Sequence, residues 1–199
     1  MGTAVMVGAV ALTAVVGCAD GGEQEGPDLS TPPTEVRWQP YQGVALPHTA
    51  QGPKVLSDGA ATGFEQSPAG AAVAAIVHTV RLSVAPDGEW PAVVAKEVAP
   101  GPARDAWVVD RVRVSITGPA DPEYAPRLRG YRITEYTGER GLVDVCTEYS
   151  DGSLAVNHIA VEWSTQDWRL RLPDLDSTAR PIAAVDALPG DIVILEAPK

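Results

Sequence analysis

The residues able to perform acid–base or nucleophilic chemistry are few in this sequence and form no familiar motif. The 199-residue chain has 3 histidines and 2 cysteines. No two histidines have the close spacing of a zinc site, and the sequence contains no Cys-x-x-Cys pair, glycine-rich phosphate loop or Gly-x-Ser-x-Gly elbow. The sequence therefore predicts neither a metal nor another cofactor, and it favours a binding role over an enzymatic one.

Two titratable residues are candidates for the polar groups of a binding cavity. His158 follows Asn157 in one predicted strand, and Asp144 lies in the predicted strand before it. Either side chain would supply the polar contact that orients a small molecule in an apolar pocket. His78 lies in an apolar stretch of predicted helix, which indicates a hydrogen-bonded core residue instead.

A second group of residues has the composition of a protein-binding surface, because aromatic side chains and arginines are enriched at interfaces. Its members are Trp90, Trp107, Arg127, Arg129 and Arg132. The alternative is that the tryptophans belong to the core and that the arginines form local ion pairs on a solvated face.

Charge and composition limit the possible partners. The net charge of −11 repels phosphate backbones, so we expect no nucleic acid to bind. The apolar fraction of 45% is sufficient for one folded core. Alanine, valine, 19 glycines and 18 prolines, with arginine far more frequent than lysine, are what GC-rich coding produces and indicate an actinobacterial source.

The first thirty-five residues have the composition of a secretion signal and a tether. Residues 3–16 are apolar or small and carry no charge, a run too short to span a membrane as a helix. Residues 19–35 are rich in glycine, proline and acids, so we expect a disordered acidic tether. The alternative is a buried N-terminal helix in which Cys18 is inert.

The order of the predicted elements is helices first, then strands. Residues 36–66 lack a sustained period and predict an extended segment that wraps the domain with Trp38 and Phe64. Ser67-Pro68 followed by apolar residues at helical spacing predicts a helix to about Val80. A shorter helix is expected over residues 90–98.

An antiparallel meander is predicted from the residues that follow. Five stretches rich in β-branched and aromatic residues are separated by turn signals: 106–116, 128–136, 141–149, 154–163 and 168–172. Asp151-Gly152 is the sharpest hairpin signal among these turns. The apolar stretches within 181–199 would add an edge strand or pair with the early extended segment.

Two resemblances extend this interpretation. Val15-Val16-Gly17-Cys18 resembles the end of a bacterial lipoprotein signal peptide, which implies cleavage after residue 17 and diacylation of Cys18. The order of helices and strands resembles an NTF2-like cone. Ala61-Thr62-Gly63-Phe64, Ser67-Pro68-Ala69-Gly70-Ala71 and the late Val161-Glu162-Trp163 and Asp167-Trp168 resemble a group of uncharacterised actinobacterial lipoproteins often associated with conjugative or integrative elements.

These resemblances imply an α+β fold, with N-terminal helices packed on a curved antiparallel sheet of four to six strands over residues 67–199. They imply a lipid-anchored domain on the extracytoplasmic face of the cell membrane. We expect it to act as a binding or scaffold subunit of an envelope or conjugation-type complex, with a protein partner in the envelope. The alternative is a small-molecule binder or enzyme that uses the cavity of the cone.

Overall fold

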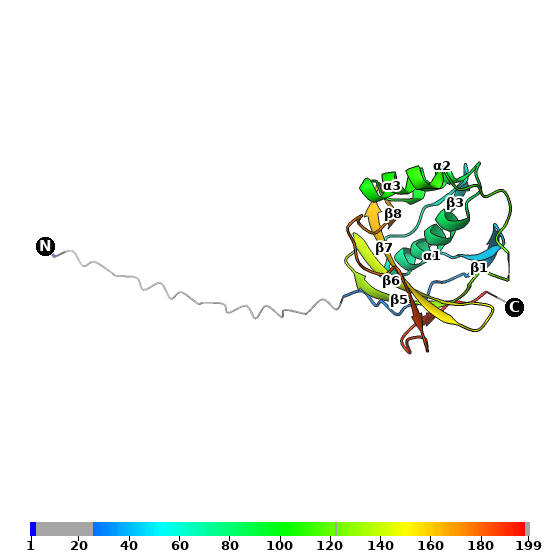
Figure 1. Cartoon of the computed structure of the whole chain (residues 1–199). Coiled ribbons are helices and arrows are strands. Elements are labelled where there is room, and N and C mark those ends of the chain that lie inside the picture. The colour runs from blue at the N-terminus through cyan, green and yellow to red at the C-terminus, as the bar shows by residue number, and fades with distance from the viewer. Residues whose placement is uncertain (3–25, 122, 198–199) are drawn as a thin grey trace.

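The structure is a computed structural model that describes residues 1–2, 26–121 and 123–197. Its helices are α1 (Pro68–Val84), α2 (Trp90–Glu97) and α3 (Pro102–Arg111). Its strands are β1 (Arg37–Tyr41), β2 (Val44–His48), β3 (Val55–Ser57), β4 (Ala60–Thr62), β5 (Arg127–Tyr136), β6 (Arg140–Glu148), β7 (Leu154–Ser164), β8 (Asp167–Arg171), β9 (Ile182–Val185) and β10 (Val193–Ile194). The described chain is therefore a mixed α+β fold, with its helices on one side of the main sheet (Figure 1).

The main sheet is an antiparallel meander with additions at its edges. Its strand order is β10-β5-β6-β7-β8, and β9 pairs with the same edge of β7 as β8 does. The sequence predictions for β5, β6, β7 and β8 are confirmed to within a few residues. Of the two possibilities for the C-terminal region, the structure shows the first, since β9 and β10 both join the main sheet.

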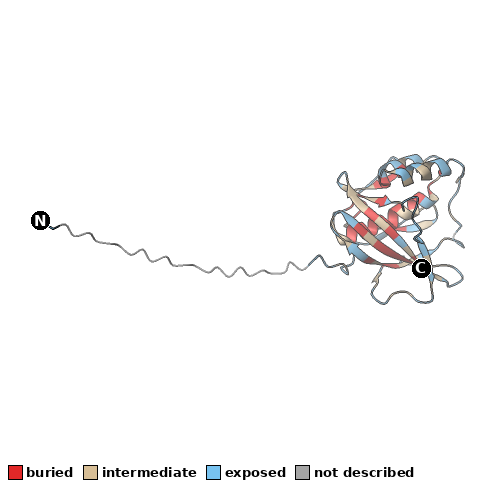
Figure 2. Ribbon diagram, turned by 60° about the vertical axis from the view of Figure 1, so that its left-hand side comes forward, coloured by how far each residue is buried: buried red, intermediate tan, exposed pale blue. Residues whose placement is uncertain are grey.

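Helix α1 supplies the middle of the core. The Ser67 Oγ accepts a hydrogen bond from the Gly70 N–H at 3.1 Å, and Pro68 takes the first helical position, as predicted. Most residues of its first two turns are buried alanines, which allow the helix to lie close to the sheet. Apolar residues from β5 to β8 complete this core, visible as the buried centre of the domain in Figure 2.

The wrapping segment of residues 36–66 consists of two hairpins and not of one extended strand. β1 pairs with β2 across the turn Gln42-Gly43, and β3 pairs with β4 across Asp58-Gly59. All four turn residues have positive φ, the geometry of the tight turns that join twisted antiparallel strands. After the second hairpin Phe64 is buried, with its ring 4.9 Å from that of His78.

The folded domain includes contacts from Leu29 onward, which lies before the predicted end of the tether at residue 35. Pro33 is buried, and Leu29 packs against the core. The Thr34 N–H donates to Gln51 Oε1 at 2.9 Å, and the Ala50 N–H donates to the Thr34 carbonyl. These contacts fix the approach to β1, so only residues before this stretch are left for a tether.

The prediction of a strand over residues 106–116 is wrong, because residues 102–111 form helix α3. The strand prediction rested on a run of β-branched valines. Helix signals outweigh it: Pro102 at the first position, Asp105 in the first turn and Arg111 in the last. Arg111 is buried and donates to the Ala85 carbonyl at 2.9 Å, which ties α3 to the end of α1.

The C-terminal segment crosses the sheet. β9 pairs with β7 and β10 pairs with β5, so residues 186–192 pass β6 from one side to the other. Asp191 in this segment binds Arg132 at 3.2 Å, which places the crossing on the side opposite α1. We call residues 186–192 the strap and this side of the sheet the back face.

Candidate functional site

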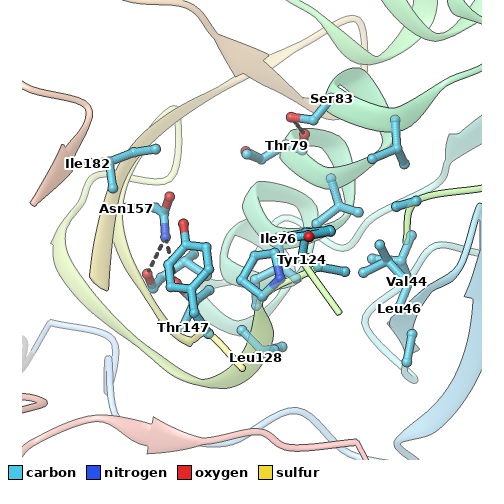
Figure 3. A pocket seen from close by; sticks show the side chains of 18 of the residues that line it. Val44, Leu46, Ile76, Thr79, Ser83, Tyr124, Leu128, Thr147, Asn157 and Ile182 are labelled. Carbon is cyan, nitrogen blue, oxygen red and sulfur yellow. Dashed lines mark hydrogen bonds between the residues drawn. The ribbon is translucent and has the colours of Figure 1, made fainter. Parts of the chain in front are cut away.

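A cavity of about 370 Å³ lies between α1 and the sheet, and we call it the α1 cavity. Its walls come from α1, β2, the loop of residues 120–126 and strands β5 to β7, with Ile182 of β9 (Figure 3). The apolar part of the lining consists of Val44, Ala45, Leu46, Ile76, Val80, Val84, Ala120, Ala125, Pro126, Leu128, Val145, Ile159 and Ile182. This size and lining are typical of a small-molecule site.

The polar groups of the α1 cavity gather where α1 faces β6 and β7. Asn157 donates through Nδ2 to the Val145 carbonyl and to Thr147 Oγ1, both at 3.2 Å. These bonds hold the amide in place and leave its Oδ1 to accept a hydrogen bond. On the opposite wall, the buried Thr79 Oγ1 has no partner among the described residues. The cavity thus presents a fixed amide, while the Thr79 hydroxyl oxygen is enclosed in the opposite wall.

The charge of the lining limits what the cavity can hold. Of the described residues that line it, only Asp121 is charged, and it lies in an exposed loop. A carboxylate or phosphate placed in this cavity would lose its hydration without gaining a cationic partner. The lining therefore disfavours an anionic group inside this cavity.

A second cavity, of about 480 Å³, lies beside β7 under the segment of residues 173–181, and we call it the edge cavity. Thr79, Ser83, Asn157, Ile159 and Ile182 line both cavities. The edge cavity differs in having charged side chains in its wall, namely Arg140, Arg171 and Asp174, together with the His158 ring.

The prediction that Asp144 and His158 line the cavity of the cone is wrong for the α1 cavity. The two residues pair directly across β6 and β7, with His158 Nδ1 2.7 Å from Asp144 Oδ1, but they lie on the back face. Arg132 binds the other Asp144 oxygen at 2.7 Å and also binds Asp191 of the strap. The cluster anchors the strap, and His158 reaches only the wall of the edge cavity.

The five residues predicted as a partner surface lie on separate elements, the tryptophans on α2 and α3 and the arginines on β5. Trp90 and Trp107 are half-buried and meet edge to face at 6.1 Å between ring centroids. Arg129 binds Glu148 and Glu196, and Arg132 is held in the back-face cluster. Arg127 is exposed and makes no ion pair with another described residue. Their role at a partner surface stays a prediction.

His78 is the hydrogen-bonded core residue that the sequence predicts. Its Nδ1 lies 2.8 Å from Glu97 Oε2, and its Nε2 lies 3.0 Å from the Trp168 carbonyl. Glu97 is fully buried and also accepts from Arg81 Nε and from the Ala61 N–H, both at 2.8 Å. This network joins α1, α2, β4 and β8, and its role is structural.

Of the two cysteines, Cys146 lies within the described residues. Cys146 is a buried free thiol, and burial raises its pKa, which makes it a poor nucleophile. Cys18, the predicted lipidation site, lies outside the described residues.

No group of three or more His, Cys, Asp or Glu side chains in the described part of the chain is placed to hold a metal ion. None of the helices described is long and apolar enough to cross a membrane.

Comparison with known proteins places the chain in a family. Residues 7–193 match the family model described as Domain of unknown function (DUF8175), and the chain belongs to that family. No curated protein and no solved structure matches it.

Proposed function

We propose that this DUF8175 domain binds a small, mainly apolar molecule in the α1 cavity and is held at the extracytoplasmic face of the cell membrane by lipidated Cys18. The observation that carries the binding proposal is the cavity itself, with its apolar walls and the fixed Asn157 amide. An apolar pocket with a few fixed polar groups is the usual form of a small-molecule site.

The arrangement of the elements supports an NTF2-like cone as the finer description of the fold. Helix α1 lies against the face of an antiparallel meander, and the α1 cavity lies between the two. The anchor rests on the sequence around Cys18, and membrane proximity would give the domain access to apolar ligands.

Binding of 1-octanol to the full chain, followed by calorimetry or NMR, tests this function. The Cys18→Ser background keeps the protein free of the predicted lipid. Val80→Trp places a large ring in the α1 cavity and should reduce octanol affinity more than tenfold, because the ring takes the space of the ligand.

The control is Val109→Trp, the same change at an exposed position of α3, which should bind as the parent does. Leu128→Trp fills the cavity from the sheet side and guards against a folding defect of the helix variant. Unchanged octanol affinity in both cavity variants, with folded proteins by circular dichroism, would refute a site in this cavity.

A docking role in an envelope or conjugation-type complex is a second candidate. Three exposed valines at the end of α3 favour it, namely Val109, Val112 and Val114, each more than half exposed. Cross-linking in native membranes tests this role, with Val109→Asp/Val112→Asp compared with the parent. Loss of a cross-linked envelope protein in the variant is expected, and an unchanged pattern would remove this surface from consideration.

A further inference from the structure

The α1 cavity and the edge cavity adjoin. The five residues common to their linings come from α1, β7 and the start of β9. The same side chains therefore line the place where the two cavities meet. Each cavity alone has a volume within the range of roughly 300–1,000 Å³ typical of ligand sites.

The edge partner of β7 changes where the cavities meet. Along one edge of β7, β9 pairs with residues 154–157 and β8 with residues 160–164. Between these ladders the His158 N–H donates to the Pro181 carbonyl at 2.8 Å, and Ile159 lines both cavities. The two cavities therefore meet beside the point where β7 passes from one edge partner to the other.

A fixed polar group lies at the same junction. Asn157 lines both cavities, and its Nδ2 donates to the Val145 carbonyl and to Thr147 Oγ1. The Asn157 Oδ1 is therefore left to accept a hydrogen bond from a ligand. The Thr79 Oγ1, on the opposite wall, is enclosed by the protein and out of a ligand's reach.

The two linings have different chemistry. Apolar side chains dominate the α1 cavity, which has no cationic residue among those described. The edge cavity has Arg140 and Arg171 in its wall. Arg171 pairs with Glu162 and Asp174, whereas Arg140 makes no ion pair within the described chain. An anionic group in the edge cavity would find Arg140 free to bind it.

We infer that the two cavities form one elongated site for a single-chain amphiphile with an anionic head group, an inference that rests on the proposed function. The hydrocarbon tail occupies the α1 cavity, and the polar linkage passes the Asn157 amide. The head group lies in the edge cavity beside Arg140.

Dodecyl phosphate, used below its micelle concentration, is the probe for the full chain with Cys18→Ser. Ala160→Trp fills the edge cavity alone, because Ala160 lines that cavity and not the other. It should weaken dodecyl phosphate binding about tenfold and leave octanol binding unchanged. Ala184→Trp, at an exposed position of β9 that lines neither cavity, is the control.

The head group is tested separately. Arg140→Gln should weaken dodecyl phosphate about threefold and leave dodecanol unchanged, as expected for a partly solvated ion pair. Arg127→Gln, an exposed arginine outside both cavities, should affect neither probe.

The outcomes separate the inference from the proposed function. Dodecyl phosphate affinity that is insensitive to both Ala160→Trp and Arg140→Gln, with octanol binding still blocked by Val80→Trp, would overturn the elongated site and leave the α1 cavity intact. Failure of octanol and dodecyl phosphate alike to bind the parent protein would overturn both.

Discussion

Glu97 is the residue on which most of the buried polar contacts converge. It is 0% exposed, and its two oxygens accept from Arg81, His78 and the Ala61 N–H. Arg81 in turn lies 4.1 Å from the centre of the Tyr41 ring and donates to the Gly59 carbonyl. One carboxylate therefore connects α2 to α1 and to both N-terminal hairpins.

Glu97→Gln should destabilise the protein by about 3–5 kcal/mol, because it leaves the buried Arg81 and His78 without their anionic partner. Urea unfolding measures the change. Glu89→Gln, which removes only the carboxylate that accepts from the Tyr41 hydroxyl, should cost about 1 kcal/mol. Equal losses for the two variants would contradict the central position of Glu97.

The Tyr131 hydroxyl is buried without a hydrogen bond, which lowers the stability of the fold. Its side chain is 0% exposed and its hydroxyl has no partner among the described residues, while burial strongly raises its pKa. Tyr131→Phe should therefore leave stability at pH 7 unchanged or raise it by about 1 kcal/mol. A loss of more than 1 kcal/mol would show that the hydroxyl is bonded after all.

The raised pKa of Tyr131 also predicts that the stability of the protein depends on pH. Because the pKa of Tyr131 is higher in the folded than in the unfolded state, the unfolded state loses the hydroxyl proton first, and the free energy of unfolding falls as pH rises above about 10. The parent protein should lose stability faster than Tyr131→Phe between about pH 10 and 12. Denaturant midpoints measured across this interval give the difference.

At the scale of elements, local patterns predicted some parts well and others poorly. The Ser67-Pro68 cap and the alternation in β5 to β8 identified α1 and the meander, since both are local signals. Asp58-Gly59 is an equally local hairpin signal. It indicates the turn between β3 and β4, which the prediction of an extended segment over residues 36–66 lacks. The valines around α3 predicted a strand because β propensity depends on neighbours that the sequence does not show.

His158 was predicted to line the cavity of the cone, whereas its neighbour Asn157 lines the α1 cavity. Asn157 faces the α1 cavity and His158 the back face, because successive side chains of a strand point to opposite sides. The apolar residues Val145 and Ile159, which share the inner face with Asn157, contained the information needed to assign it. The edge cavity depends on how residues 173–181 fold back, and no local pattern predicts that.

Arg111 holds helix α3 against the rest of the domain. Besides the Ala85 carbonyl, the Arg111 guanidinium binds Asp87 and lies 5.4 Å from the Trp90 ring centre. Arg111→Lys keeps the charge but cannot form these contacts together. Amide hydrogen exchange in α3 should speed up roughly tenfold or more, whereas Arg113→Lys, at an exposed position, should leave it unchanged.

At the scale of the whole molecule, the sheet separates two environments. The side facing α1 contains the α1 cavity, and the back face contains the Arg132–Asp144–His158 cluster covered by the strap. Cys146 alternates with Val145 and therefore belongs to the back face, where it pairs with Gly130 of β5. The buried thiol of Cys146 therefore lies on the same face of the sheet as the strap.

Closure of the strap requires a glycine at position 130. A Cβ at this position would lie 2.4 Å from the Val193 carbonyl oxygen, so any side chain there must displace β10. We expect Gly130→Ala to release β10 and the strap, to lower stability by about 1–3 kcal/mol and to increase the rate at which a thiol reagent modifies Cys146. Gly118→Ala, where a Cβ meets nothing within 4 Å, is the matched control.

Because the α1 cavity opens on the other side of the sheet, octanol binding should persist in Gly130→Ala. Loss of octanol binding together with exposure of Cys146 would mean that the two faces are coupled, and that the strap supports the cavity through the sheet.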